Sequence, residues 1–178
     1  YQLALTNLEV KIMFQRMIHD WFVPVKSEYY DFVKAMFLGD VDAMNEYMNR
    51  VALQTFSYFD TGERASGAEP ERFYHGFVLG LLVDLQGSYY VKSNRESGFG
   101  RYDVMLEPKK PGKDPAVILE FKVRSTRKEN SLEETAQSAL AQIKDRKYSE
   151  ELKEKGIAGE QIKEYGFAFE GKNVLIVN

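Results

Sequence analysis

The sequence predicts an α/β fold with a helical segment first, then a helix, a three-stranded antiparallel meander, a second helix and two further strands. Three observations predict it. Apolar residues recur every three or four positions over 33–51 and 73–85, the spacing of amphipathic helices. An apolar run at 116–123 follows a turn-forming segment and a strand candidate at 102–107. A long amphipathic stretch over 132–155 separates this meander from two apolar strand candidates.

The composition is that of a folded protein. The 178 residues are 44% hydrophobic and 29% charged, which allows one packed domain, or a small domain with an appendage, and disfavours disorder. The net charge is -3. A protein that grips duplex DNA over a broad surface usually has a basic excess, so this charge argues against tight nonspecific binding by this chain alone.

The absence of cysteine and of long apolar runs excludes several kinds of site and restricts where the protein is expected to act. The chain has no cysteine, which excludes disulfides, zinc–thiolate sites and cysteine nucleophiles, and fits a reducing, cytoplasmic location. No apolar run approaches the roughly 18 to 20 residues that span a bilayer, and no signal peptide is visible, so no membrane partner is expected. The chain begins at Tyr1, and we expect it to be a fragment of something longer or to have a trimmed start.

The first part of the chain, residues 1–59, is predicted to be mostly helical. Gly39 and Asp40 break the apolar periodicity, with Asp40 as the N-cap of the second helix. The small and polar stretch 60–69 is the expected linker. We therefore predict a helical segment over 1–62 and a separate domain over 63–178.

The second domain is predicted to start with a helix that begins near Pro70 and ends at Gly87. Ser131 is the expected N-cap of the later helix, with Glu134 three residues on, as in a capping box. The other elements are strands at 89–92, 102–107 and 116–123, a helix over 132–155, and strands at 166–169 and 173–177.

Two charged residues are set into the most apolar strand. Side chains alternate along a strand, so Glu120 and Lys122 share one face. If the preceding turn centres near Pro111 and Gly112, antiparallel pairing places position 103 opposite positions 120 to 122, and Asp103 is brought beside this pair.

Two adjacent carboxylates repel each other unless they share a cation. Hard divalent ions such as Mg²⁺ prefer carboxylate and carbonyl oxygens, and a nearby lysine can orient a water or neutralise charge on a phosphate. The set therefore suits metal-assisted phosphodiester hydrolysis. The alternative is a structural salt bridge within a sheet. The tripeptide E-x-K is itself uninformative, because it also occurs outside this strand.

A family resemblance appears at these residues. It lies in the segments SNRESGFGRYDVMLEP, AVILEFKV, the helix with ALAQI, and YGFAFEGKNVLIV. From about Glu69 to the end, the chain resembles the PD-(D/E)XK nuclease superfamily. More narrowly, it resembles the nuclease domain that follows an AAA-ATPase-like domain in many bacterial proteins. The segment TNLEVKIMF and the helices up to SYFD resemble the end of that ATPase-like module.

The resemblance implies a restriction-endonuclease-like core and assigns roles. Asp103 matches the family's motif aspartate, and Glu120 and Lys122 match its (D/E)XK pair. Both acids would bind Mg²⁺ or Mn²⁺, the backbone carbonyl of Phe121 would add a ligand, and Lys122 would be the catalytic lysine.

The family often has a further acid on its first core helix, and Glu71 is the candidate for this catalytic and metal-binding position. Glu71 shares a helix face with His75, four residues on, and that face continues into apolar positions. The alternatives are Glu69, or a Glu71 that only favours the first turn of its helix.

Nucleic-acid contacts are expected at two places. Arg95 and Arg101 flank a glycine loop and are candidates for phosphate contacts. The branch of the family related to bacterial recombination nucleases often has a glutamine and a tyrosine on the later helix. Gln142 and Tyr148 are the candidates here, but their spacing of six predicts different helix faces, which favours Gln142 alone.

The segment GFAFEGK at 166–172 approaches a phosphate-binding loop. Asn173 replaces the required Ser or Thr, and a strand follows where that loop needs a helix, so we predict a hairpin turn without an ATP site.

The sequence thus favours a Mg²⁺-dependent nuclease that acts on nucleic acid, with DNA as the expected substrate and an N-terminal ATPase-like domain as the expected partner. A second interpretation is a catalytically idle nuclease fold that serves as a binding or regulatory module beside that ATPase-like domain. A third is a structural domain whose charged strand residues form a salt bridge.

Overall fold

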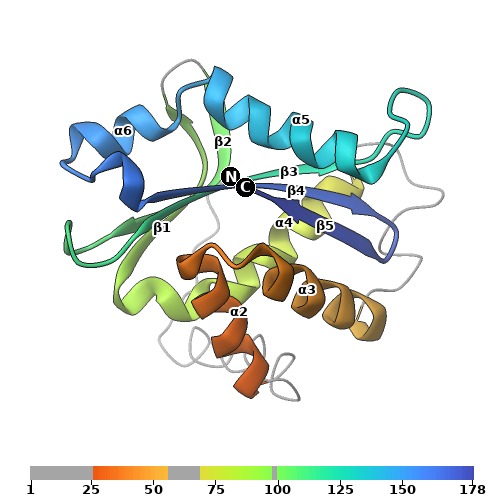
Figure 1. Cartoon of the computed structure of the whole chain (residues 1–178), viewed down its shortest axis with the longest axis horizontal. Helices are drawn as coiled ribbons and strands as arrows, with labels where there is room; N and C mark the ends of the chain where they lie inside the picture. The colour runs from red at the N-terminus through yellow and green to blue at the C-terminus, as the bar shows by residue number, and fades with distance from the viewer. Residues whose placement is uncertain (1–25, 56–68, 98–99) are drawn as a thin grey trace, which may run out of the picture.

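The computed structural model describes residues 26–55, 69–97 and 100–178. Two layers of helices enclose a five-stranded sheet, with α5 and α6 on one face and α2, α3 and α4 on the other (Figure 1). The elements are α2 (Lys26–Leu38), α3 (Val41–Thr55), α4 (Glu69–Leu81), η2 (Val83–Gly87), β1 (Tyr89–Ser97), β2 (Gly100–Pro108), β3 (Ala116–Val123), α5 (Leu132–Asp145), α6 (Ser149–Glu154), η3 (Gly159–Gln161), β4 (Ile162–Glu170) and β5 (Asn173–Val177). The predicted α/β class and element order are confirmed.

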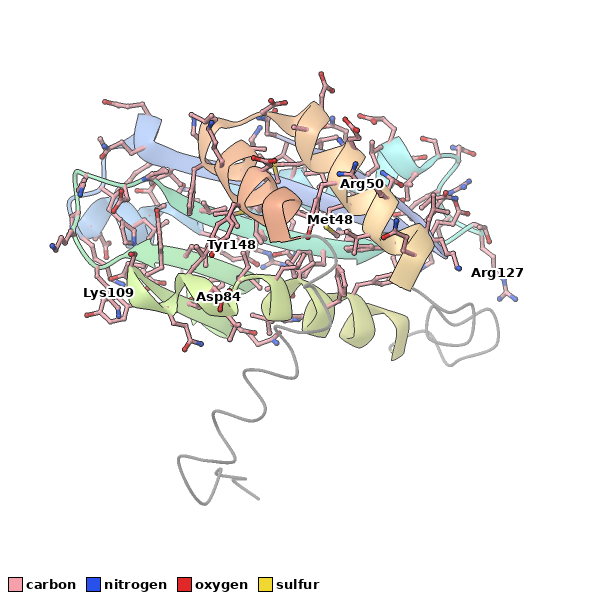
Figure 2. All side chains as sticks on the ribbon, turned by 90° about the horizontal axis from the view of Figure 1, so that it is seen from below. Met48, Arg50, Asp84, Lys109, Arg127 and Tyr148 are labelled. Atoms are coloured by element: carbon pink, nitrogen blue, oxygen red, sulfur yellow. The ribbon has the colours of Figure 1, made fainter. Side chains whose placement is uncertain are left out.

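The strands lie in the sheet in their order along the chain, β1 to β5. Neighbouring strands pair antiparallel at β1–β2, β2–β3 and β4–β5, and parallel at β3–β4. A parallel neighbour needs a long crossover, and α5 with α6 supplies it above the sheet (Figure 1). The β2–β3 hairpin with Lys109 and the loop after β3 with Arg127 lie at opposite ends of the molecule (Figure 2).

The hairpin between β2 and β3 has the predicted register. Its turn contains Gly112 with φ of 85°, a conformation that glycine adopts without the steric cost of a side chain. Val104 pairs with Leu119, so the next positions outward, Asp103 and Glu120, face each other.

The first two strands are longer than the sequence predicts. β1 and β2 continue beyond the apolar positions, and Arg95 pairs with Tyr102 while Glu96 pairs with Arg101. Arg95 and Arg101 therefore lie on paired strands, on either side of residues 98–99. β4 likewise starts at Ile162, earlier than the predicted 166. Backbone ladders do not require apolar side chains, so polar ends of strands leave no periodic signal.

The helix expected over 132–155 is two helices. The chain breaks between α5 and α6 at Lys147, whose φ of 55° is costly for a residue with a side chain. Burial of Tyr148, which is 1% exposed, offsets that cost. The start of α5 follows the prediction, because Ser131 Oγ accepts a hydrogen bond from the Glu134 N–H at 3.1 Å.

A smaller difference concerns the first core helix. The α-helix ends at Leu81, and the predicted continuation to Gly87 is the 3₁₀ helix η2. The break predicted at Gly39 and Asp40 is confirmed: Gly39 has φ of 82°, and Asp40 Oδ1 accepts a hydrogen bond from the Ala43 N–H at 3.1 Å.

The N-terminal helices share the core of the sheet. Apolar residues of α2, α3 and α4 form one buried cluster with residues of all five strands, and a second cluster lies between the sheet and α5 and α6. Two asparagines of α3 also pair with the free edge of β5: Asn49 with both backbone groups of Val174, and Asn45 with both of Ile176. This closes a sheet edge that would otherwise be open to other strands.

The division at residue 62 stays a prediction, and the linker at 60–68 lies outside the described residues. Its last predicted position, Glu69, is the first residue of α4. None of the helices in the described part of the chain is both long and apolar enough to cross a membrane.

Candidate metal centre

The two charged residues of β3 project from a buried central strand toward α5. Glu120 is 4% exposed and Lys122 is partly exposed. Phe121 between them points to the opposite face, where its ring packs edge-on against Phe167 at 5.4 Å between centroids. The alternation predicted from the sequence therefore puts both charges on one face.

Asp103 meets this pair from β2, at a point where the strand ladder is interrupted. Its Oδ2 accepts a hydrogen bond from the Phe121 backbone N–H at 2.8 Å. On its other side the β1 ladder runs from the Ser93 pair to the Arg95 pair and omits Asn94, which has φ of 51°. The side chain of Asp103 thus takes the place of a backbone acceptor and is anchored beside Glu120.

The electrostatics of Glu120 are unusual for an acid. Burial, and second to it the Asp103 carboxylate, raise the pKa of Glu120 to about 8. The Asp103 backbone N–H, the Lys122 ammonium and the Gln142 amide oppose this rise in part. Oε2 of Glu120 is buried and has no hydrogen-bond partner among the described residues. A buried oxygen of this kind is costly unless a proton or a cation meets it.

These groups fit a hard divalent cation. Two carboxylates with a partly exposed side suffice, because Mg²⁺ is commonly held by one or two carboxylates and water. Phe121 donates its N–H toward β2, and since the C=O of a strand residue points the same way as its N–H, that carbonyl also points toward β2. Among the side chains that the structure describes, which do not include that of Glu71, no group of three or more His, Cys, Asp or Glu residues is arranged to hold a metal.

Helix α5 supports both charged residues of β3. Gln142 donates a side-chain hydrogen bond to Oε1 of Glu120, and Lys122 Nζ donates to Ser138 Oγ at 3.0 Å. The structure places the Gln142 amide against Glu120, and the nucleic-acid contact expected of Gln142 stays a prediction. Ser138 was missed. The sequence feature that could have identified Ser138 is its position four residues before Gln142, which puts both side chains on one face of the helix.

Tyr148 joins this group, contrary to the prediction from helix spacing. The break at Lys147 turns the buried Tyr148 back toward Gln142, which hydrogen-bonds to it. Burial and then the charge of Glu120 raise the pKa of Tyr148. Gly100 of β2 lies against the same ring, because a Cβ built there would be 3.0 Å from the Tyr148 hydroxyl oxygen.

The structure leaves three predicted side chains undescribed. Glu71 lies in the first turn of α4, and Arg95 and Arg101 lie on β1 and β2, but their side chains lie outside the described residues. Their predicted roles stay predictions. His75, on the helix face predicted for Glu71, is 8% exposed, lies 2.9 Å from Ser93 Oγ through Nε2 and packs edge-on against Phe121.

The segment 166–172 is a hairpin, as predicted. It runs from β4 into β5, and its turn contains Gly171 with φ of 58°. No helix N-terminus follows it, so it lacks the geometry of a phosphate-binding loop.

Comparison with known proteins agrees with this geometry. A family model described as the PD-(D/E)XK nuclease superfamily matches residues 69–178, more than half of the chain, including Asp103, Glu120 and Lys122. Searches among curated proteins and among solved structures gave no match.

Proposed function

The chain belongs to the PD-(D/E)XK nuclease superfamily, and we propose that it is a divalent-metal-dependent nuclease that hydrolyses phosphodiester bonds of DNA. One observation carries the proposal. Two carboxylates from neighbouring strands, Asp103 and Glu120, converge beside Lys122, and the buried Oε2 of Glu120 has no hydrogen-bond partner among the described residues.

Asp103 and Glu120 would hold Mg²⁺ or Mn²⁺, and the carbonyl of Phe121 and the side chain of Glu71 are further proposed ligands. The bound ion would supply Lewis-acid polarisation of the phosphate and a more acidic water. A hydrogen bond from the Phe121 N–H orients the Asp103 carboxylate, and a hydrogen bond from the Gln142 amide orients the Glu120 carboxylate. Both carboxylates are therefore held in fixed orientations before the substrate binds, so that less reorganisation of the site is needed during the reaction.

Lys122 would act on the substrate side of the same centre. Its ammonium group orients the attacking water or neutralises charge that builds on the phosphate. Lys122 is partly exposed, which allows contact with a substrate. The rest of β3 is mostly buried, and this holds the Lys122 backbone in place.

The proposed substrate is DNA, and the overall charge limits how it is held. A net charge of -3 gives little long-range attraction for a polyanion, so binding must rely on local cations. Arg95 and Arg101 are proposed phosphate contacts. An N-terminal ATPase-like domain is the proposed partner that supplies further affinity.

The test is cleavage of plasmid, linear duplex DNA, single-stranded DNA and RNA with Mg²⁺, Mn²⁺ or EDTA. Asp103→Asn and Lys122→Met are compared with Asp84→Asn and Lys110→Met, which make the same chemical changes at exposed positions. Metal-dependent cutting that only the first two variants abolish supports the proposal. A folded wild-type chain, joined to its N-terminal partner, that cuts none of the four substrates contradicts it and favours a binding or regulatory module.

A further inference from the structure

Helix α5 presents two side chains, one turn apart, to the two charged residues of β3. Ser138 meets Lys122, and Gln142 meets Glu120. Positions four apart on a helix rise by about 6 Å, and positions two apart on a strand by about 6.6 Å. Because these spacings match, one docked helix can support both residues.

The height of α5 above the sheet is set by a close backbone contact. Gly166 of β4 pairs with Glu120, and a Cβ built on Gly166 would lie 2.3 Å from the Ala136 carbonyl oxygen and 2.7 Å from the Leu140 nitrogen. Only a residue without a side chain lets the helix backbone rest there. Ser138 lies between Ala136 and Leu140, so its position over the sheet is fixed by the same contact.

A lysine side chain without a hydrogen-bond partner at its end adopts many conformations. Lys122 has four rotatable side-chain bonds, and ordering such a chain costs about 1.5 to 2 kcal/mol. In the structure its Nζ donates to Ser138 Oγ at 3.0 Å, and this is the hydrogen bond that ties its free end to a rigid element.

We propose that Ser138 is the positioning residue of Lys122: its hydroxyl holds the ammonium group at the height and direction that the reaction needs. The proposal rests on the proposed function, because it takes Lys122 as the catalytic lysine. It adds a residue that acts through another and does not touch the substrate.

The first measurement is the split between kcat and KM for cleavage. Ser138→Ala is expected to lower kcat about fivefold to tenfold, as loss of about one hydrogen bond predicts, with KM unchanged. Ser138→Thr keeps the hydroxyl and is expected to restore kcat. The matched control is Ser131→Ala, which removes the N-cap of the same helix and leaves Lys122 untouched.

A fall in kcat for Ser131→Ala as large as that for Ser138→Ala would mean that helix stability, and not the hydroxyl, is responsible, and would overturn the proposal. So would a Ser138→Ala variant that cuts at the wild-type rate.

The second measurement is the Lys122 ¹⁵Nζ resonance in metal-free protein, assigned with Lys122→Arg. We expect it to shift or broaden in Ser138→Ala and to stay in place in Ser131→Ala; an unchanged resonance in Ser138→Ala overturns the contact itself. If the folded wild-type chain joined to its N-terminal partner cuts none of the four substrates, the proposed function fails and the catalytic part of this proposal fails with it. A resonance that still shifts would then identify the contact as structural only.

Discussion

Asp103 accepts the backbone N–H of Phe121 at 2.8 Å, so an acid on β2 is fixed by the residue that separates Glu120 from Lys122 on β3. This contact uses a backbone donor that an uninterrupted β2–β3 ladder would have consumed. The interruption of the sheet and the meeting of the two carboxylates are therefore the same structural feature.

The first prediction concerns the coupling of the two acids. Asp103→Asn keeps an oxygen that accepts the Phe121 N–H but removes the negative charge beside Glu120. We expect the pKa of Glu120 to fall from about 8 yet to stay above its ordinary value of 4.5, because burial is the larger cause of the rise. An NMR titration of the Glu120 carboxyl carbon measures this, with Asp84→Asn as control. A pKa unchanged by Asp103→Asn would show that the carboxylates do not interact.

The second prediction concerns stability and pH without metal. The folded-state pKa of Glu120 is about 8, above the ordinary 4.5, so the folded state binds this proton more tightly than the unfolded chain does. Its contribution to stability is therefore fully present below about pH 4.5 and is lost as the pH rises through 8. Glu120→Gln mimics the protonated acid and is expected to be more stable than wild type at pH 9, by a few kcal/mol.

Urea unfolding in EDTA at pH 5 and pH 9 measures this difference. The two proteins should differ less at pH 5 than at pH 9. A Glu120→Gln variant that gains nothing between the two pH values would contradict the buried, metal-free acid that the structure describes.

The third prediction concerns the close contact between α5 and Gly166 of β4. Gly166→Ala places a methyl group against helix backbone, so we expect a loss of about 2 to 3 kcal/mol in the free energy of unfolding and a lower rate of cleavage. Gly76→Ala is the control, because a Cβ there meets nothing within 4 Å, and alanine favours a helix. Equal stability of the Gly166→Ala and wild-type proteins would show that α5 does not rest on β4 as described.

The fourth prediction concerns the N-terminal helices. Asn49→Ala removes both hydrogen bonds to Val174 on the edge of β5, so we expect a loss of about 1 to 2 kcal/mol in unfolding free energy. Glu46→Ala, at an exposed position of the same helix, should change stability little. If Asn49→Ala behaves like Glu46→Ala, α3 does not stabilise the sheet through this edge.

Patterns that are local in the sequence predicted much of the fold. The apolar run of β3, the turn at Gly112 and the cap at Ser131 each depend on neighbouring residues, and the register that brings Asp103 opposite Glu120 follows from the turn.

What could not be predicted depends on contacts that are distant in the sequence. The break at Lys147 has no glycine or proline to mark it and is offset by burial of Tyr148. Ser138 and the amide contact of Gln142 depend on where α5 docks, and that docking depends on Gly166, a residue of a later strand. No pattern within α5 contains this information.

In the proposed mechanism, Asp103 and Glu120 together hold the metal for phosphodiester hydrolysis. The most direct measurement is Mg²⁺-dependent cleavage of end-labelled DNA by wild type and by Glu120→Gln at pH 8, with the melting temperature of each measured separately in EDTA. We expect Glu120→Gln to melt no lower than wild type yet to fail to cut, because its neutral amide lacks the negative charge that would hold the metal. Cleavage by Glu120→Gln at the wild-type rate would show that Glu120 does not hold the metal.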